Sequence, residues 1–470
     1  MSDEAAAAIP LPAARRAMAA RTRLLLEGPV APTLLRLAAP NVVVMLLQAA
    51  VGTLDAVFVG WLGADALAGV SLVFPLLMLM QTMSAGGMGG GVASAVARAL
   101  GAGQRREADA LVAHAILVAL AMAALFTTAA LAAGPALYHA MGGAGPTLDA
   151  ALRYSRVIFG GAVAYWLYNT LGAVVRGTGN MALPAAVMVA NAAVYLALSP
   201  ALIAGWGPLP RLGVAGAAAA SVASFALGSL VLCAYLASGR SLVRLSLARL
   251  RLRRALFWEI LRVGAPGSLN TVLTNLTIVL VTALVGPFGP TALAGYGMGS
   301  RLEYLQIPLV FGLGGALVTM VGTNIGAGQR ARAERVAWVG AGLAAAMTGG
   351  IGLAGALFPR MWLELFSADA QVLAAGTVYL RTVGPTYGFF GLGLALYFAS
   401  QGAGRLGWPL FAGFARLMLA GAGGWLAIHG LGGGLAGLFL TMAAAMIAFG
   451  SVNALAIRLG AWRGAGKDPT

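Results

Sequence analysis

Two acidic residues stand in apolar stretches long enough to cross a membrane, and they are the first candidates for chemistry. Asp55 lies in the stretch that ends at Gly60, and Glu303 lies between residues 291 and 321. A charge at the bilayer centre costs at least ~2.5–3.5 kcal/mol, so an acid kept at depth is expected to be functional. A carboxyl group shielded from water favours its protonated form and releases the proton when water enters. Asp55 is therefore a candidate proton carrier, the alternative being a neutral Asp that bonds a neighbouring helix.

Glu303 is joined at depth by two arginines, Arg301 and Arg416. Residues two apart on a helix point to different sides, so Arg301 and Glu303 cannot pair directly. Glu303 either binds a cation or substrate or forms an ion pair between helices, with Arg416 as a candidate partner. Aromatic and methionine side chains bind apolar cations by stacking and cation–π contact, and together they predict a mixed cavity for substrate. The spans expected to face the cleft carry these: Phe74, Met78, Tyr165, Trp166, Tyr168, Tyr304, Phe311, Tyr387, Phe389 and Phe390.

Enzyme chemistry finds little support in the remaining residues. His114, His139 and His429 are far apart, and no HExxH, CxxC, GxSxG or P-loop spacing occurs. Cys233 is the one cysteine and lies in an apolar run, which excludes a disulfide framework. We therefore expect no catalytic residues, no metal site and no cofactor.

The composition is that of a protein embedded in a membrane. Of the 470 residues 60% are hydrophobic and 9% charged, whereas soluble domains have roughly 25% charged residues. A net charge of +16 raises nucleic acid as a partner. Because the basic segments are short and separated by apolar runs, they fit the positive-inside rule better, and no nucleic acid is expected.

Twelve apolar stretches have about the 20 residues that a membrane helix needs. They predict spans near 36–60, 65–92, 108–133, 150–174, 182–204, 213–237, 258–286, 291–321, 333–358, 370–399, 408–429 and 434–457. Of the 30 basic residues, 23 then fall on one side and five on the other, with Arg301 and Arg416 inside spans. The distribution predicts a multi-pass protein of the cell (inner) membrane with both termini cytoplasmic.

The second half repeats the first at an offset of 225 to 226 residues. The matches are Arg36-Leu-Ala-Ala-Pro40 with Arg262-Val-Gly-Ala-Pro266, Gly101-Ala-Gly-Gln-Arg105 with Gly326-Ala-Gly-Gln-Arg330, Gly177-Thr-Gly179 with Gly402-Ala-Gly404, and Arg156 with Arg381. Six spans per copy give two parallel lobes related by a pseudo-two-fold axis along the membrane normal, with substrate between them. The expected organisation is an amino-terminal tail at 1–35, a lobe at 36–238, a basic linker at 239–257, a lobe at 258–458 and a carboxy-terminal tail at 459–470.

With these spans and the paired Gly-Ala-Gly-Gln-Arg loops, the sequence resembles the multidrug and toxic compound extrusion (MATE) family over residues 36–460. Arg176-Gly-Thr-Gly-Asn180 is similar to the family's loop between spans four and five. The resemblance implies efflux of cationic or amphipathic compounds in exchange for H⁺ or Na⁺, by rocking of two lobes. Asp55 matches the first-helix acid of the DinF-like branch, to which the chain is closer.

The resemblance also implies the neighbours of Asp55. Tyr195 and Ser221 stand where polar members of that cluster fall, and Ser199 precedes Pro200 where the branch tends to have a second Asp. The span-seven acid of the NorM-like branch has no equivalent in residues 267–285. A Na⁺ site uses several hard oxygens whereas a proton needs one titrating group, so H⁺ is favoured over Na⁺ as the coupling ion.

The hypothesis is a cation-coupled antiporter, acting as a monomer in the lipid bilayer on small organic cations or amphipathic drugs. A flippase for a lipid-linked or glycan intermediate is the alternative, and it would require a strongly basic cavity for a pyrophosphate. A membrane scaffold or channel is a third possibility. Transport of an organic cation by vesicles with an imposed pH or Na⁺ gradient separates them.

Overall fold

The chain folds into helices joined by short turns. The computed structural model describes residues 21–245 and 251–463, so parts of both expected tails and of the linker lie outside the described residues. Within these ranges ten helices are long and apolar enough to cross a bilayer, and a pair bent by 46° brings the number to eleven. The remaining expected span, the tenth at 370–399, is formed by two shorter helices around a 3-10 turn, α14, η3 and α15. The predicted all-α polytopic fold is confirmed.

The first half contains six spans. They are α2 (Val30–Gly60), then α3 (Ala64–Thr82) continued by the π-helix η1 (Met83–Met88) and α4 (Gly89–Gly101), then α5 (Arg105–Ala140), the bent pair α6 (Gly145–Gly160) and α7 (Ala162–Gly177), α8 (Ala182–Ala204) and α9 (Val214–Ala237).

The second half repeats this order. It comprises α10 (Arg254–Val285) with η2 (Gly286–Phe288), α11 (Pro290–Gly326), α12 (Arg330–Leu357), the short α13 (Pro359–Leu363), α14 (Ala370–Val383) with η3 (Gly384–Thr386) and α15 (Tyr387–Ala403), α16 (Gly407–Met418) with the π-helix η4 (Leu419–Gly423) and α17 (Gly424–His429), and α18 (Gly434–Arg458).

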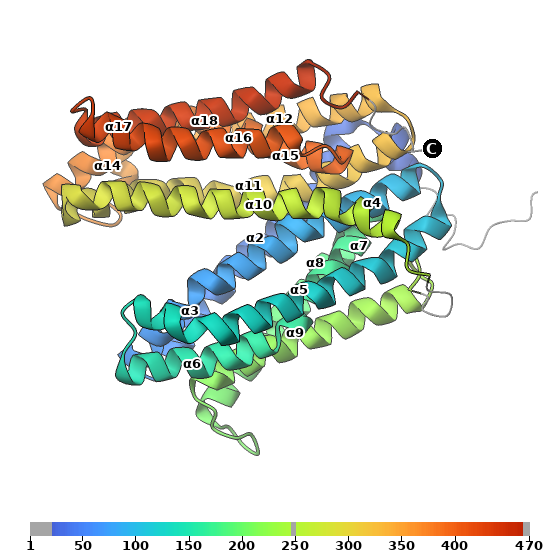
Figure 1. Cartoon of the computed structure of the whole chain (residues 1–470), viewed down its shortest axis with the longest axis horizontal. Helices are drawn as coiled ribbons and strands as arrows, with labels where there is room; N and C mark the ends of the chain where they lie inside the picture. Colours follow the sequence, from blue (N-terminus) through green and yellow to red (C-terminus); the bar gives the residue numbers. More distant parts are fainter. Residues whose placement is uncertain (1–20, 246–250, 464–470) are drawn as a thin grey trace, which may run out of the picture.

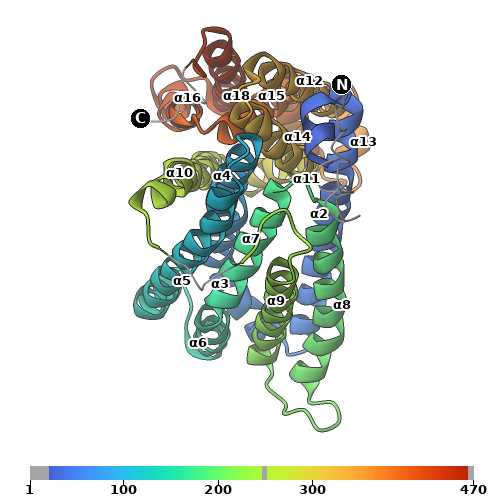
Figure 2. The same ribbon diagram turned by 90° about the vertical axis from the view of Figure 1, so that its right-hand side faces the viewer.

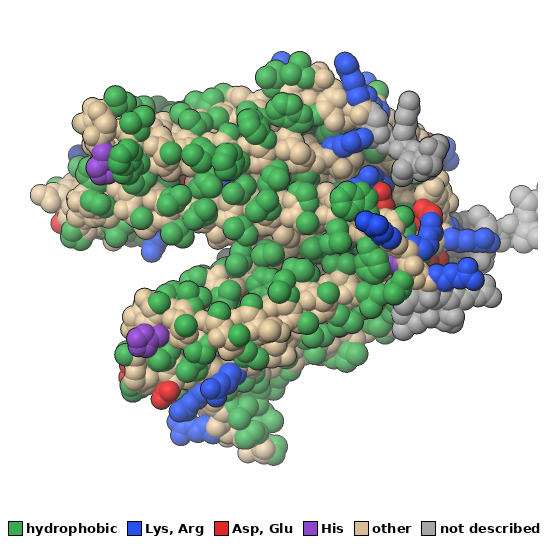
Figure 3. Space-filling model, in the orientation of Figure 1, with side chains coloured by type: hydrophobic (Ala, Val, Ile, Leu, Met, Phe, Trp, Pro, Cys, Tyr) green, Lys and Arg blue, Asp and Glu red, His purple; other side chains and the backbone are tan. Residues whose placement is uncertain are grey.

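The two halves form two bundles that meet at one end and diverge at the other. In Figure 1 the helices of the first half lie below those of the second, and the bundles converge at the right. Figure 2, viewed from that converging end, shows α4 and α7 reaching up against the second bundle. The space-filling view has an open wedge between the bundles at the left and a group of arginines at the right (Figure 3). We call the two ends the open end and the closed end.

The repeated Gly-Ala-Gly-Gln-Arg motifs explain how closely the bundles approach at the closed end. A Cβ atom added to Gly101 would lie 2.1 Å from the Thr323 carbonyl oxygen, and one added to Gly326 would lie 2.0 Å from the Arg98 carbonyl oxygen. Contacts under 3.0 Å require the backbone to move. Each repeat therefore supplies the glycine that lets its helix, α4 or α11, pack against the other half.

Two hydrogen bonds across the closed end follow the same pseudo-symmetry. Ser94 Oγ donates to the Gln401 carbonyl oxygen at 2.6 Å, and Thr319 Oγ1 donates to the Arg176 carbonyl oxygen at 3.0 Å. Ser94 and Thr319 are 225 residues apart, as are Arg176 and Gln401. The repeat seen in the sequence is thus a repeat of contacts, arranged about an axis that passes between the bundles.

Candidate functional site

A cavity of about 310 Å³ lies between the two bundles, above the contacts of the closed end. Its walls come from α2, the α3–η1–α4 segment, α7 and α8 of the first half and from α11 and α15 of the second. This volume matches the lower end of the range for small-molecule sites, which is roughly 300–1,000 Å³. The cavity is lined by both halves, so a change in their relative position changes its shape.

Most polar groups of the cavity are neutral. Tyr165 and Tyr168 line it with their phenol groups. Amide side chains line it from α2, α3, α7 and α15: Asn41, Gln48, Gln81, Asn169 and Gln401. Among its described lining residues Arg176 is the one with a charged side chain. The cavity therefore combines aromatic and amide surface with a single positive charge.

The acid of the first half occupies a separate site towards the open end. The Tyr195 hydroxyl on α8 donates a hydrogen bond to Asp55 Oδ1 on α2. Tyr154 on α6 is buried close enough to Asp55 for electrostatic interaction. Ser199 is fully buried one helical turn beyond Tyr195, beside its hydroxyl. The expected cluster of Asp55, Tyr195 and Ser199 is thus brought together, with Tyr154 added.

Ser221, the fourth residue expected in this cluster, has a different place in the described structure. It lies on α9, and its carbonyl oxygen accepts a hydrogen bond from Ser224 Oγ at 2.9 Å. Within residues 21–245 and 251–463 no hydrogen bond connects its side chain to Asp55.

The acid of the second half is surrounded by phenols and an arginine. Tyr379 OH donates to Glu303 Oε2 at 3.1 Å, and Tyr387 OH donates to Tyr379 OH at 3.4 Å. Arg416 lies near enough to act on Glu303 electrostatically. It is not paired with it, however: Arg416 Nη2 donates to Thr274 Oγ1 at 2.8 Å. The Arg416 guanidinium also lies over the ring of Phe449, 4.9 Å from its centroid.

Six residues in particular were expected around the substrate, and none of them is among the described residues that line the cavity: Arg301, Glu303, Tyr304, Trp166, Phe389 and Arg416. Glu303 lies one turn closer to the open end than Ile307, the first cavity residue of α11. Arg301 places its guanidinium 5.2 Å from the ring centroid of Phe366 in the loop after α13. These positions differ from expectation because sequence depth does not reveal helix rotation.

The other expected cavity residues also lie elsewhere. Trp166 is fully buried and packs against Phe126 at 5.8 Å between ring centroids, so it belongs to the core of the first bundle. Tyr304 and Phe389 are exposed, and Arg416 is held among Thr274 and Phe449 as described above. Three aromatic residues of the wider sequence set, Tyr165, Tyr168 and Phe311, do line the cavity.

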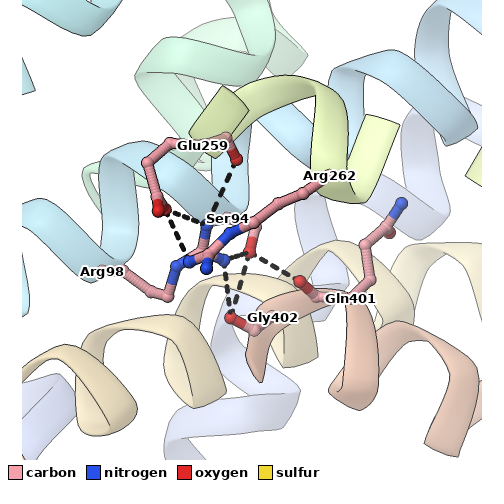
Figure 4. Close-up of polar contacts among 6 residues, drawn as sticks. All are labelled: Ser94, Arg98, Glu259, Arg262, Gln401 and Gly402. Atoms are coloured by element: carbon pink, nitrogen blue, oxygen red, sulfur yellow. Dashed lines mark hydrogen bonds and ion pairs between the residues drawn. The ribbon is translucent and has the colours of Figure 1, made fainter. Parts of the chain in front are cut away.

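A cluster of charged residues fastens the closed end between the halves (Figure 4). Arg98 of α4 pairs with Glu259 Oε2 of α10 at 3.0 Å, and Arg262 pairs with the same oxygen at 2.6 Å. Arg98 also donates to Ser94 Oγ and, at 3.3 Å, to the Gly402 carbonyl oxygen. One carboxylate thereby neutralises part of the charge of two guanidinium groups, and three helices are joined.

The second and fourth expected spans end at residues 92 and 174, which puts Arg98 and Arg176 in loops on the basic side, and the structure corrects this prediction. The second expected span, 65–92, continues as a helix to Gly101, and α7 continues to Gly177. Both arginines therefore lie on helices, one in the closed-end cluster and one on the cavity wall. The residue that matches Arg176 in the repeat, Gln401, lines the same cavity from the second half.

Comparison with known proteins identifies the family to which this architecture belongs. A family model described as MatE matches residues 40–201 and again residues 266–426. The FAD transporter of Shewanella oneidensis is 28% identical over 378 residues, covering 80% of this chain and 82% of the relative. A probable multidrug resistance protein NorM of Deinococcus radiodurans is 33% identical over 370 residues, covering 74% and 77%.

The fold is also similar to that of solved structures. A crystal structure of MATE in the bent conformation has a TM-score of 0.87 to this structure and 25% sequence identity, and the match covers 95% of this chain and 99% of that one. Since the family model matches most of the chain, once in each half, the chain belongs to the MatE family, whose members are membrane transporters and not enzymes.

Proposed function

We propose that the chain is a proton-coupled antiporter that exports amphipathic organic compounds across the cell membrane by alternating access. The observation that carries the proposal is that one helix, α2, serves both sites. Asp55 lies near its end, whereas Asn41 and Gln48 line the cavity two to four turns away. Pro40 lies inside the same helix and removes one backbone hydrogen bond, which makes a bend there less costly.

The distribution of charge supports a direction for transport. The closed end carries the arginine cluster, and the positive-inside rule assigns such an end to the cytoplasm. The open wedge between the bundles then faces outward. The described conformation would be the one that releases its compound and takes up a proton, with both termini cytoplasmic and the chain acting as a monomer in the inner membrane.

The proton step follows from the contacts of Asp55. In the outward-facing state water reaches the partly exposed carboxyl group, and protonation removes its charge. The hydrogen bond that it accepts from Tyr195 then weakens, since charged acceptors bind roughly twice as strongly as neutral ones. The α2–α8 contact rearranges, α2 bends and its cavity residues move, which expels the compound. Opening of the closed end then requires separation of Arg98 from Glu259.

The oxygen groups around Asp55 favour H⁺ over Na⁺ as the coupling ion. Around Asp55 stand phenol and serine hydroxyl groups, and no second carboxylate is among the described neighbours. A Na⁺ ion prefers several hard oxygen ligands, often carboxylates, whereas a proton needs one titrating group. The lipid-linked flippase has less support, because a pyrophosphate calls for several basic groups and the described cavity wall offers Arg176 alone.

Vesicle transport tests the proposal. Purified protein in proteoliposomes should drive accumulation of ethidium or flavin mononucleotide when a pH gradient is imposed, and a Na⁺ gradient should have no effect. Asp55→Asn should reduce the pH-driven rate to that of empty vesicles. Asp65→Asn is the matched control, because Asp65 is exposed at the start of α3 and bonds Thr147. Unchanged transport by Asp55→Asn would contradict the coupling role.

A further inference from the structure

We propose that the cavity binds amphipathic organic anions, with Arg176 holding a carboxylate, sulfonate or phosphate group and the aromatic side chains holding a planar ring system. The inference rests on the proposed export function and assigns its substrate class. It narrows the expectation drawn from the family resemblance, in which organic cations stand first.

The starting point is an arginine without a counter-charge. Arg176 lies on α7 where the two halves meet, and its carbonyl oxygen is bonded by Thr319 from α11. The five ion pairs among described residues do not include its guanidinium, and no hydrogen bond within residues 21–245 and 251–463 uses it. Among these residues, the ionisable side chain that interacts electrostatically with the Arg176 guanidinium is the phenol of Tyr168.

An unpaired cation away from bulk water is costly unless something compensates it. The described cavity wall supplies amides, phenols and apolar groups but no carboxylate. Arg98 at the closed end shows the contrast, because its guanidinium is paired with Glu259. In the cavity the compensating charge has to come from water or from a ligand, and an anionic group on the compound would supply it while an organic cation would be repelled.

Aromatic groups around the arginine suit the apolar part of such a compound. Tyr165 and Tyr168 lie on the same helix as Arg176, and across the cavity Phe311 packs edge-on against Phe398 at 5.0 Å between centroids. Flat rings stack well on such side chains. A planar multi-ring molecule with one acidic group therefore fits the cavity in size, shape and charge.

The protein itself suggests the matched substitution. Gln401 stands at the pseudo-symmetric position in the second half and lines the same cavity, so a glutamine is compatible with this helix crossing. Arg176→Gln removes the charge, whereas Arg176→Lys keeps it without the two-pronged geometry. Arg335→Gln, at an exposed position of α12, controls for the loss of one positive charge from the whole protein.

Binding to the purified full chain tests the proposal by comparing two ligands that share one ring system. Flavin mononucleotide carries a phosphate that riboflavin lacks, and ethidium provides a planar cation. Wild type should bind flavin mononucleotide at least about tenfold more tightly than riboflavin, as expected for a hydrogen bond to a charged group. Arg176→Gln should remove that preference and leave riboflavin binding unchanged, Arg176→Lys should keep part of it, and Arg335→Gln all of it.

Each outcome has one meaning. Equal binding of the two flavins by wild type, or tighter binding of ethidium, overturns the anion site, and neither result depends on a variant folding. Retention of the preference by a folded Arg176→Gln protein also overturns it. If the phosphate preference is found but no pH gradient drives transport of any probe, the proposed antiport fails while the anion site stands.

Discussion

The two halves of the molecule have matching backbones and different acids. Asp55 lies on the first helix of the first half, at a position that is Val281 in the second, whereas Glu303 lies on the second helix of the second half, where the first has Leu77. Asp55 lies near the buried phenol of Tyr154, and Glu303 accepts a hydrogen bond from Tyr379, the residue that matches Tyr154 at an offset of 225. The duplicated scaffold therefore offers a phenol in each lobe, and the acid has been placed differently against it.

The difference bears on which acid would carry the proton in the proposed exchange. Asp55 is partly exposed near the open end, and its described neighbours are hydroxyl groups. Glu303 has Arg416 nearby and Tyr379 bonded to it, and Arg416 is in turn held by Thr274. Glu303 is thus surrounded by side chains of its own lobe, whereas the contacts of Asp55 join two helices near the open end. We infer that Glu303 anchors its lobe and Asp55 responds to water.

The largest expected contrast is between the two acids. Glu303→Gln should retain proton-driven transport, with a loss of stability of about 1 kcal/mol from the weaker bond to Tyr379, whereas Asp55→Asn should abolish transport. Initial rates in proteoliposomes and thermal unfolding in detergent measure both effects. A Glu303→Gln protein that folds normally and fails to transport would assign coupling to the second lobe as well.

Steric changes at the closed end should affect the halves equally. Gly101→Ala and Gly326→Ala each place a methyl group against a backbone oxygen of the other half, and each should cost about 3 kcal/mol, the upper end for overpacking. Thermal unfolding in detergent should show shifts of similar size for the two variants. Gly297→Ala on α11 is the control, because nothing lies within 4 Å of its added Cβ and alanine favours the helix.

The sequence predicted the scaffold better than the site. Apolar length and a 225-residue repeat are properties of whole segments, so the twelve spans and their parallel order could be predicted without knowing how any helix is rotated. The contact between Asp55 and Tyr195 joins two helices, and it was expected because a family resemblance implied it. The Tyr154–Tyr379 match was available from the repeat, since each residue precedes a matched arginine, Arg156 or Arg381, by two positions.

Arg176 was missed for a physical reason. Charge counting places an arginine near a span end on the basic side, because such residues usually reach water. Whether the side chain turns instead into a cavity depends on the rotation of α7 and on the second half packing against it. Glu303 is expected in the substrate cavity and lies one turn outside it, because only the packed structure gives the rotation and register of α11.

The smallest expected effect concerns a feature that the repeat does not duplicate. In the repeat, Arg98 corresponds to Thr323 and Glu259 corresponds to Thr33, and two threonines cannot form an ion pair. The closed end is therefore symmetric in its glycines and asymmetric in its charges. Glu259→Gln leaves Arg98, which is only 10% exposed, without its counter-charge and should cost about 2 kcal/mol. Glu107→Gln breaks the pair with Arg253, whose side chains are 51% and 37% exposed, and should cost at most about 1 kcal/mol. Thermal unfolding in detergent compares the two. Equal small shifts would mean that the glycine contacts hold the closed end without the ion pair, and the asymmetry between the halves would then be confined to the two acids and the cavity arginine.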